Sequence, residues 1–153
     1  MFERLFELFK PEIYETPLPE ADAEHAFGAL MVRVAKADKA VLYQELERID
    51  FILAQRNDLS AVDAAKFRAS CEKLEEAMPS TRELSEILVK EVPEPDREQM
   101  FIALWEVLLA DGFRDAREED VVDRVATVLG IGSNRASVLA ANVLPGMPNK
   151  DGT

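Results

Sequence analysis

The sequence has few of the residues from which disulfides and structural zinc sites are built. It contains a single cysteine, Cys71, and a single histidine, His25, among 153 residues. One cysteine excludes an intramolecular disulfide, and neither residue has companions at the spacing of a structural zinc site. No glycine-rich phosphate loop is present, and no nucleophile is evidently paired with a general base. We therefore expect a protein without enzymatic activity or an organic cofactor, in a reducing compartment, the cytoplasm.

Long apolar runs are also missing, and basic residues are few. No run approaches the ~20 apolar residues of a transmembrane helix, and residues 1–10 lack the apolar core and cleavage site of a secretory signal. The chain has 18 Lys and Arg against 30 Asp and Glu, a net charge of -12. This charge repels the phosphates of nucleic acids. It favours a cation or a basic protein partner and predicts no nucleic-acid partner.

Residues that favour helices make up most of the chain. Glycine is scarce, and Ala, Leu, Glu, Lys and Arg are abundant. Apolar residues cover most of the helix circumference over residues 22–36 and 100–110, which predicts two buried central helices. Narrower apolar stripes follow each of them and predict covering helices. We expect one all-α domain of about seven or eight helices.

Two stretches of the sequence repeat each other at an offset of 73 residues. Ala29–Asp38 aligns without a gap on Ile102–Asp111, and Glu45 falls on Glu118. Each copy reads as an apolar helix, an Ala-Asp break and an acidic amphipathic helix. Repeats of this kind usually reflect duplicated structure. We expect two pseudo-repeated halves, at about residues 21–78 and 95–144.

The two ends of the chain differ in character from the domain, which we place at residues 21–144. Phe2, Leu5, Phe6 and Phe9 recur at helical spacing and predict a short amphipathic helix over residues 2–9, joined to the domain by a proline-rich tether up to residue 20. The apolar face of that helix could dock on the core, on a protein partner or on a membrane surface. Residues 145–153 are expected to form a flexible tail.

Several helix starts are marked by capping residues. Ser60 precedes one apolar stripe, and Ser80 with Glu83 forms a capping-box pattern, in which the two side chains accept hydrogen bonds from backbone amides. Asp96 with Gln99 repeats the pattern and predicts a helix that begins after Asp96. A last helix is expected over residues 133–144.

Each Ala-Asp break places carboxylates between a buried helix and the next one. In the second copy these are Asp111, Asp115 and Glu118, and Gly112 permits a sharp turn. Calcium, magnesium and manganese are bound by clustered oxygen ligands of this kind. The loop is not an EF-hand, because Val122 stands where the bidentate glutamate belongs. These three carboxylates are therefore candidate ligands of a divalent cation in a site without that motif.

The first copy keeps only part of this pattern. Asp38 and Glu45 match Asp111 and Glu118, but Lys39 and Leu42 stand where the second copy has Gly112 and Asp115. We therefore expect Asp38 and Glu45 to form a degenerate counterpart of the second site.

Helix capping is the alternative role of these acids. Asp115 and Glu118 fit a capping box, which would engage both carboxylates with backbone amides for roughly 1 kcal/mol. If the acids only cap helices, we expect a protein-interaction adaptor that uses the apolar face of residues 2–9.

The paired motifs resemble a known family. The patterns Ala-Leu-Met-Val-x-Val-x-x-Ala-Asp and Leu-Trp-x-Val-Leu-Leu-Ala-Asp-Gly are each followed seven residues later by glutamate, and the second copy closes in Val-Leu-Gly-Ile. Over about residues 21–144 the chain resembles the TerB-like (tellurite resistance protein B) family of bacterial helical domains. The resemblance implies a duplicated helical fold, acidic helix junctions that bind divalent cations, and a role in stress responses to metals and oxyanions such as tellurite.

The resemblance carries over to five positions. Asp111 and Glu118 in the second copy and Asp38 and Glu45 in the first match the acids of the motif, and Asp115 matches an acid or cap position. Lys39 and Leu42 depart from it. The expected function is a non-enzymatic cytoplasmic module that binds a divalent cation, a protein partner, or both.

Overall fold

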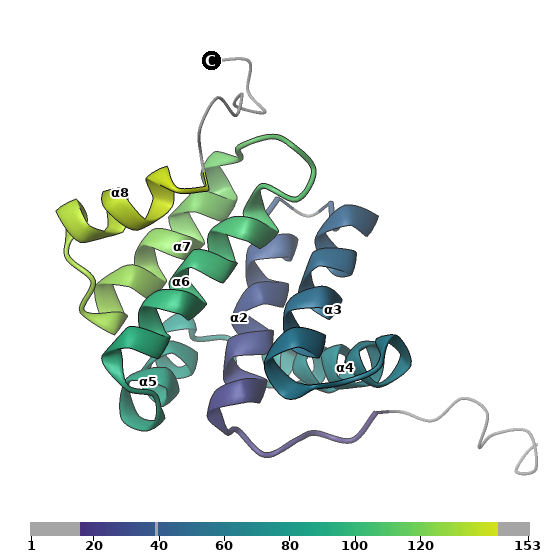
Figure 1. The fold of residues 1–153 in the computed structure, drawn as a ribbon. Coiled ribbons are helices and arrows are strands. Elements are labelled where there is room, and N and C mark those ends of the chain that lie inside the picture. Colours follow the sequence, from purple (N-terminus) through teal and green to yellow (C-terminus); the bar gives the residue numbers. More distant parts are fainter. Residues whose placement is uncertain (1–15, 39, 144–153) are drawn as a thin grey trace, which may run out of the picture.

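The computed structural model describes residues 16–38 and 40–143, which fold into α-helices and connecting loops without a β-strand (Figure 1). Seven helices lie in this part of the chain: α2 (Ala23–Lys36), α3 (Tyr43–Asn57), α4 (Ala61–Ala77), α5 (Thr81–Glu91), α6 (Glu94–Leu108), α7 (Ala116–Leu129) and α8 (Ser133–Ala141). The prediction of a single all-α domain is confirmed.

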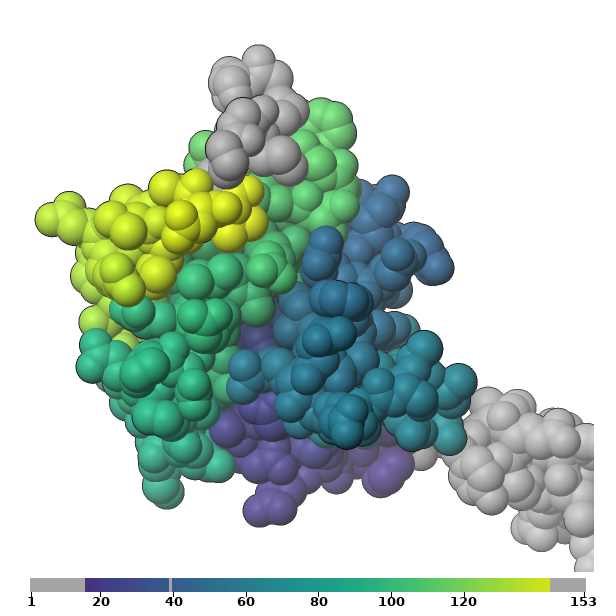
Figure 2. Space-filling view, in the orientation of Figure 1, coloured from purple at the N-terminus to yellow at the C-terminus, as the bar shows by residue number. Residues whose placement is uncertain are grey.

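Helix α2 is the centre of the bundle, and α3, α4, α5, α6 and α7 pack around it (Figure 1 and Figure 2). Its residues from Ala26 to Val32, together with Val34 and Ala35, are buried. A helix that is apolar on nearly all sides must lie inside a fold, as the sequence predicted. Helix α6 has the same character, with Phe101, Leu104 and Leu108 among its buried residues.

Gly28 allows α4 to approach α2 closely. A Cβ atom at this position would overlap the sulfur of Cys71 on α4. Cys71 is fully buried, and burial raises the pKa of its thiol to about 12. The residue therefore packs as a small apolar side chain and is not a reactive thiolate at neutral pH.

The predicted caps are correct at two helices and wrong at a third. The hydroxyl oxygens of Ser60 and Ser80 accept hydrogen bonds from the amides of Asp63 and Glu83, each at 3.1 Å. Helix α6, in contrast, begins at Glu94 and takes Pro93 as its N-cap, so Asp96 lies inside its first turn. Pro95 does not delay the helix, because the first turn has no intrahelical partner for the amide that proline lacks.

The predicted N-terminal helix over residues 2–9, most of the tether and the tail over residues 145–153 lie outside the described residues. No helix among the described residues is long and apolar enough to cross a membrane. Tyr43 begins α3 and Ala116 begins α7, which agrees with the sequence offset of 73 residues. The structural duplication of the two halves stays a prediction.

The α2–α3 and α6–α7 connections lie at the same end of the bundle, the upper end in Figure 1. Helices α2 and α6 run in the same direction along the bundle, so their C-terminal ends meet there. This arrangement brings the two Ala-Asp breaks of the sequence together.

Candidate metal centre

Asp115 is the N-cap of α7 and is held firmly in place. Its Oδ1 atom accepts hydrogen bonds from the amides of Arg117 at 2.9 Å and Glu118 at 3.2 Å. Its Oδ2 atom lies 3.3 Å from Nη2 of Arg117. Asp115 is only 2% exposed. The predicted capping role of Asp115 is therefore observed.

The surroundings of Asp115 favour its charged form. Burial raises the pKa of the carboxyl group, but the hydrogen bonds from the Glu118 amide and from the guanidinium and amide of Arg117 lower it more. The net pKa lies below the ordinary value of 3.8. Asp115 is consequently a carboxylate at neutral pH, which is the form that binds a cation.

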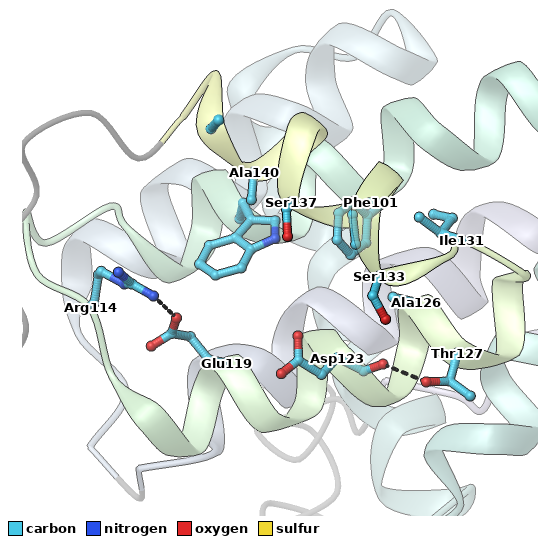
Figure 3. Close-up of a pocket in the computed structure, with 13 residues that line it drawn as sticks. Phe101, Arg114, Glu119, Asp123, Ala126, Thr127, Ile131, Ser133, Ser137 and Ala140 are labelled. Atoms are coloured by element: carbon cyan, nitrogen blue, oxygen red, sulfur yellow. Dashed lines mark hydrogen bonds and ion pairs between the residues drawn. The ribbon is translucent and has the colours of Figure 1, made fainter.

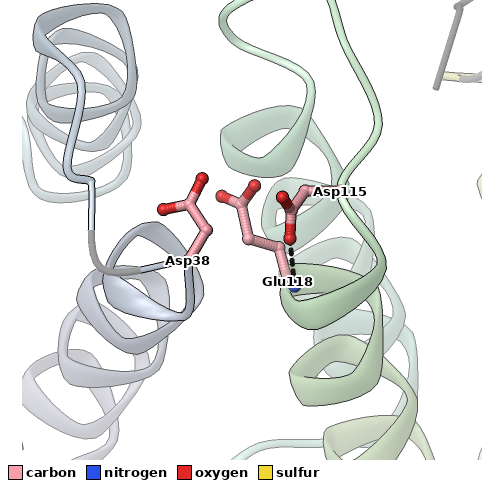
Figure 4. A group of neighbouring side chains, drawn as sticks. All are labelled: Asp38, Asp115 and Glu118. Carbon is pink, nitrogen blue, oxygen red and sulfur yellow. Dashed lines mark hydrogen bonds between the residues drawn. The ribbon is translucent and has the colours of Figure 1, made fainter. Parts of the chain in front are cut away.

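Glu118 lies in the first turn of α7 and is fully buried. Its side chain points from α7 toward the end of α2, where Asp38 lies (Figure 4). Asp38 follows Ala37, the C-cap of α2, and its Oδ1 atom accepts a hydrogen bond from the Ala40 amide at 3.0 Å. The two residues come from helix junctions that are far apart in the sequence.

Asp38, Asp115 and Glu118 together form an acidic triad. Each offers one carboxylate oxygen, and these oxygens all lie within 4.8 Å of one another (Figure 4). Calcium binds oxygen ligands at 2.3–2.6 Å, so two ligands on opposite sides of the ion are at most about 5 Å apart. The spacing of the triad is therefore compatible with three ligands of one hard cation.

Like charges at this spacing repel one another. Two carboxylate charges about 5 Å apart interact unfavourably by on the order of 3 kcal/mol at the effective dielectric constant of a protein surface. A divalent cation between the carboxylates attracts each of them, so the net electrostatic interaction at the site becomes favourable. The chemistry of three carboxylates suits calcium, magnesium or manganese, and water would complete the coordination.

Two of the five predicted ligands lie outside the triad. Glu45 is fully buried, and its Oε1 atom accepts a hydrogen bond from the Leu42 amide at 3.1 Å. Asp111 accepts a hydrogen bond from the Phe113 amide at 3.0 Å. These contacts are of the capping and turn-stabilising kind. The roles of Glu45 and Asp111 as ligands stay predictions.

The five candidate ligands from the sequence include all three residues of the triad, but the sequence grouped the candidates within each copy. The structure joins one acid of the first copy, Asp38, to two acids of the second, Asp115 and Glu118. The available signal was the placement of both acidic breaks at the ends of buried helices. The parallel packing of α2 and α6, which brings the breaks together, has no local sequence signature.

A sequence model of one protein family, described as "Tellurite resistance protein TerB", matches residues 24–140. This range includes most of the chain and all three residues of the triad. The chain belongs to the TerB family. No curated protein and no solved structure matches it.

The residues that match the family model include the helix junctions from which the triad is built. The match extends from the first turn of α2 to the last turn of α8 and includes both acidic junctions. The triad is therefore part of the TerB domain itself and does not belong to the flanking residues.

Proposed function

We propose that this TerB-family protein binds one divalent cation at Asp38, Asp115 and Glu118 and acts as a binding module without enzymatic activity. The observation that carries the proposal is the convergence of three carboxylate oxygens within 4.8 Å. Calcium, magnesium and manganese are the candidate ions, because carboxylates are hard ligands.

The two hydrogen bonds to Oδ1 of Asp115 support this proposal. They fix the side chain at the start of α7, so the ion would not have to order that ligand itself. The positive end of the α7 dipole also stabilises the carboxylates of Asp115 and Glu118. Capping and cation binding are therefore compatible at Asp115.

A bound cation would connect the α2–α3 junction to the α6–α7 junction. An ion at a hundredfold its dissociation constant should stabilise the folded chain by ~2.7 kcal/mol, because it binds the unfolded chain weakly. The midpoint temperature of thermal unfolding should therefore rise with millimolar calcium, magnesium or manganese. A chelator should reverse this rise.

Two matched substitutions test the assignment of the site. Asp38→Asn keeps an oxygen for the Ala40 amide but removes a ligand charge, and we expect it to abolish most of the cation effect. Asp111→Asn is the control, because it changes the equivalent residue outside the triad. If Asp111→Asn abolishes the cation effect and Asp38→Asn does not, the triad is the wrong site.

A second candidate function is a protein-interaction adaptor whose acids only cap helices. The observed caps at Asp115 and Glu45 favour it, and so do the exposed aromatic residues Tyr43 and Phe51 on α3. This function predicts unchanged thermal unfolding with every divalent cation. It also predicts that deletion of residues 1–10 abolishes partner capture and leaves the domain folded.

We further propose that the protein acts in the cytoplasm in a response to metal or oxyanion stress. The family description, which names tellurite resistance, supports this role. Cells that lack the protein should survive tellurite less well and recover with the wild-type chain. Recovery with Glu118→Gln would separate the stress role from cation binding.

A further inference from the structure

The face of the domain formed by α6, α7 and α8 is hollowed. A cavity of about 800 Å³ opens between these helices (Figure 3). Its apolar lining includes Phe101, Trp105, Ala126, Ile131 and Ala140. Small-molecule and peptide sites often have this volume and an apolar surface with a few polar groups.

Two buried donors of this cavity have no acceptor among the residues that the structure describes. Trp105 is only 5% exposed, and its Nε1 atom is buried without a hydrogen-bond partner in that part of the chain. The Nε atom of Arg114 is buried and unpartnered as well. Buried polar groups in native proteins are almost always hydrogen-bonded, so an unpaired indole N–H in a cavity wall indicates an acceptor that a ligand would supply.

The rim of the cavity is acidic. Glu119 forms an ion pair with Arg114, whereas the carboxylate of Asp123 has no ion-pair partner among the described residues (Figure 3). Burial, Glu119 and Asp120 all raise the pKa of Asp123. A cationic group beside Asp123 would relieve this repulsion.

The cavity is open along one side. Ser133 and Ser137 of α8 line it and are exposed, as is Asp123. An open apolar groove with hydroxyl groups along its rim suits an extended peptide better than an enclosed small molecule. The net charge of -12 would attract a basic segment from a distance.

We propose that this cavity binds a basic, partly apolar segment of a partner protein. A backbone carbonyl of the segment accepts the hydrogen bond from Nε1 of Trp105, and a lysine or arginine side chain pairs with Asp123. Apolar side chains of the segment cover Ile131 and Ala136, which line the cavity and are partly exposed.

This site is distinct from the acidic triad, although both use the start of α7. Arg114 and Glu119 line the cavity, while their sequence neighbours Asp115 and Glu118 belong to the triad. Binding of the segment does not require the cation, so the two proposals can fail independently.

Trp105 is the only tryptophan of the chain and therefore reports on the site directly. The probe is a synthetic peptide of alternating lysine and leucine, titrated into the full chain at physiological salt with a chelator present. We expect a saturable shift of the single indole N–H resonance. A glutamate and leucine peptide of equal length should cause no shift.

Matched substitutions separate the site from general attraction to an acidic surface. Asp123→Asn should weaken binding of the lysine peptide about fivefold, as expected for the loss of one partly exposed ion pair. Asp120→Asn removes the same charge outside the cavity, from a residue that pairs with Arg124 at 3.0 Å, and should change affinity by less than about twofold. Ser137→Phe should block the cavity without disturbing the core.

Three results would overturn the proposal. Equal weakening by Asp123→Asn and Asp120→Asn would show nonspecific attraction. Binding that Ser137→Phe leaves intact would place the peptide elsewhere. An indole N–H that is already hydrogen-bonded in the chain alone, and that the peptide does not shift, would show that another part of the chain fills the cavity.

Discussion

The α2–α3 and α6–α7 junctions share one kind of hydrogen bond. Asp38 accepts a hydrogen bond from the Ala40 amide at 3.0 Å, and Asp111 accepts one from the Phe113 amide at the same distance. The two aspartates are equivalent in the sequence repeat. Both stabilise the turn that leaves the buried helix, in the manner of an Asx turn.

The next helix starts differently at the two junctions. Asp115 caps α7 with its side chain, whereas Leu42 at the equivalent position has no oxygen to offer. Glu45 instead reaches back to the Leu42 amide, and its counterpart Glu118 points toward Asp38 (Figure 4). The two junctions thus differ in the N-cap residue of the next helix, which is aspartate at one and leucine at the other.

The largest expected difference between the junctions concerns Glu118 and Glu45. With a saturating divalent cation, Glu118→Gln should lose most of the ~2.7 kcal/mol of cation-dependent stabilisation, and Glu45→Gln should keep it. Each variant is compared with itself in chelator by thermal or urea unfolding, so any basal loss of stability cancels. Equal losses in both variants would show that the junctions act as one ligand set.

The cap at Asp115 should have the next largest effect. Asp115→Ala removes the acceptor for two amides and should destabilise the chain by about 1–2 kcal/mol in chelator, measured by urea unfolding. Asp115→Asn keeps an acceptor oxygen and should cost less. If the two variants are equally destabilised, the charge and not the hydrogen bonds holds the start of α7.

The pH dependence of the free energy of unfolding should differ between the wild-type chain and the uncharged variant Asp115→Asn. Because its pKa in the folded chain is below the ordinary 3.8, ionised Asp115 stabilises the fold above that pH. This contribution is lost as the pH falls through the folded-state pKa. The free-energy difference between wild type and Asp115→Asn in chelator should therefore shrink between about pH 5 and pH 2. A difference that grows toward acid pH would contradict the assigned direction.

The smallest expected effects are those of the two turn aspartates without a cation. Asp38→Ala and Asp111→Ala each lose one exposed hydrogen bond, and we expect each to cost about 0.5–1 kcal/mol in chelator. The two costs should be nearly equal by urea unfolding. Addition of a cation should separate them, because only Asp38 belongs to the triad.

Local sequence signals predicted which segments form helices better than they predicted the residues at which those helices begin. Ser80 caps α5 because its short side chain reaches the amide three residues on, a purely local geometry. Asp96 carries the same signal, but Pro93 and Pro95 can occupy the start of a helix and place it earlier. A capping pattern shows that a helix begins nearby and does not decide between competing start positions.

The cavity has features that the periodicity of the sequence does not predict. Trp105 sits on a helix that is apolar on nearly all sides, which predicts burial, and it is buried. Periodicity does not show that its N–H lacks an acceptor among the described residues or that Asp123 lines the same cavity. Both facts depend on where α8 packs.

The sequence by itself determined the all-α class, the two buried central helices and the acidic residues that follow them. These features follow from helix propensity, periodicity and capping, which act over a few residues of the chain. Only the tertiary structure decided that Asp38 meets Asp115 and Glu118, while Asp111 and Glu45 lie outside the triad. The physical reason is that α2 and α6 pack in parallel around one core, and contacts between their ends depend on that packing and not on separation along the chain.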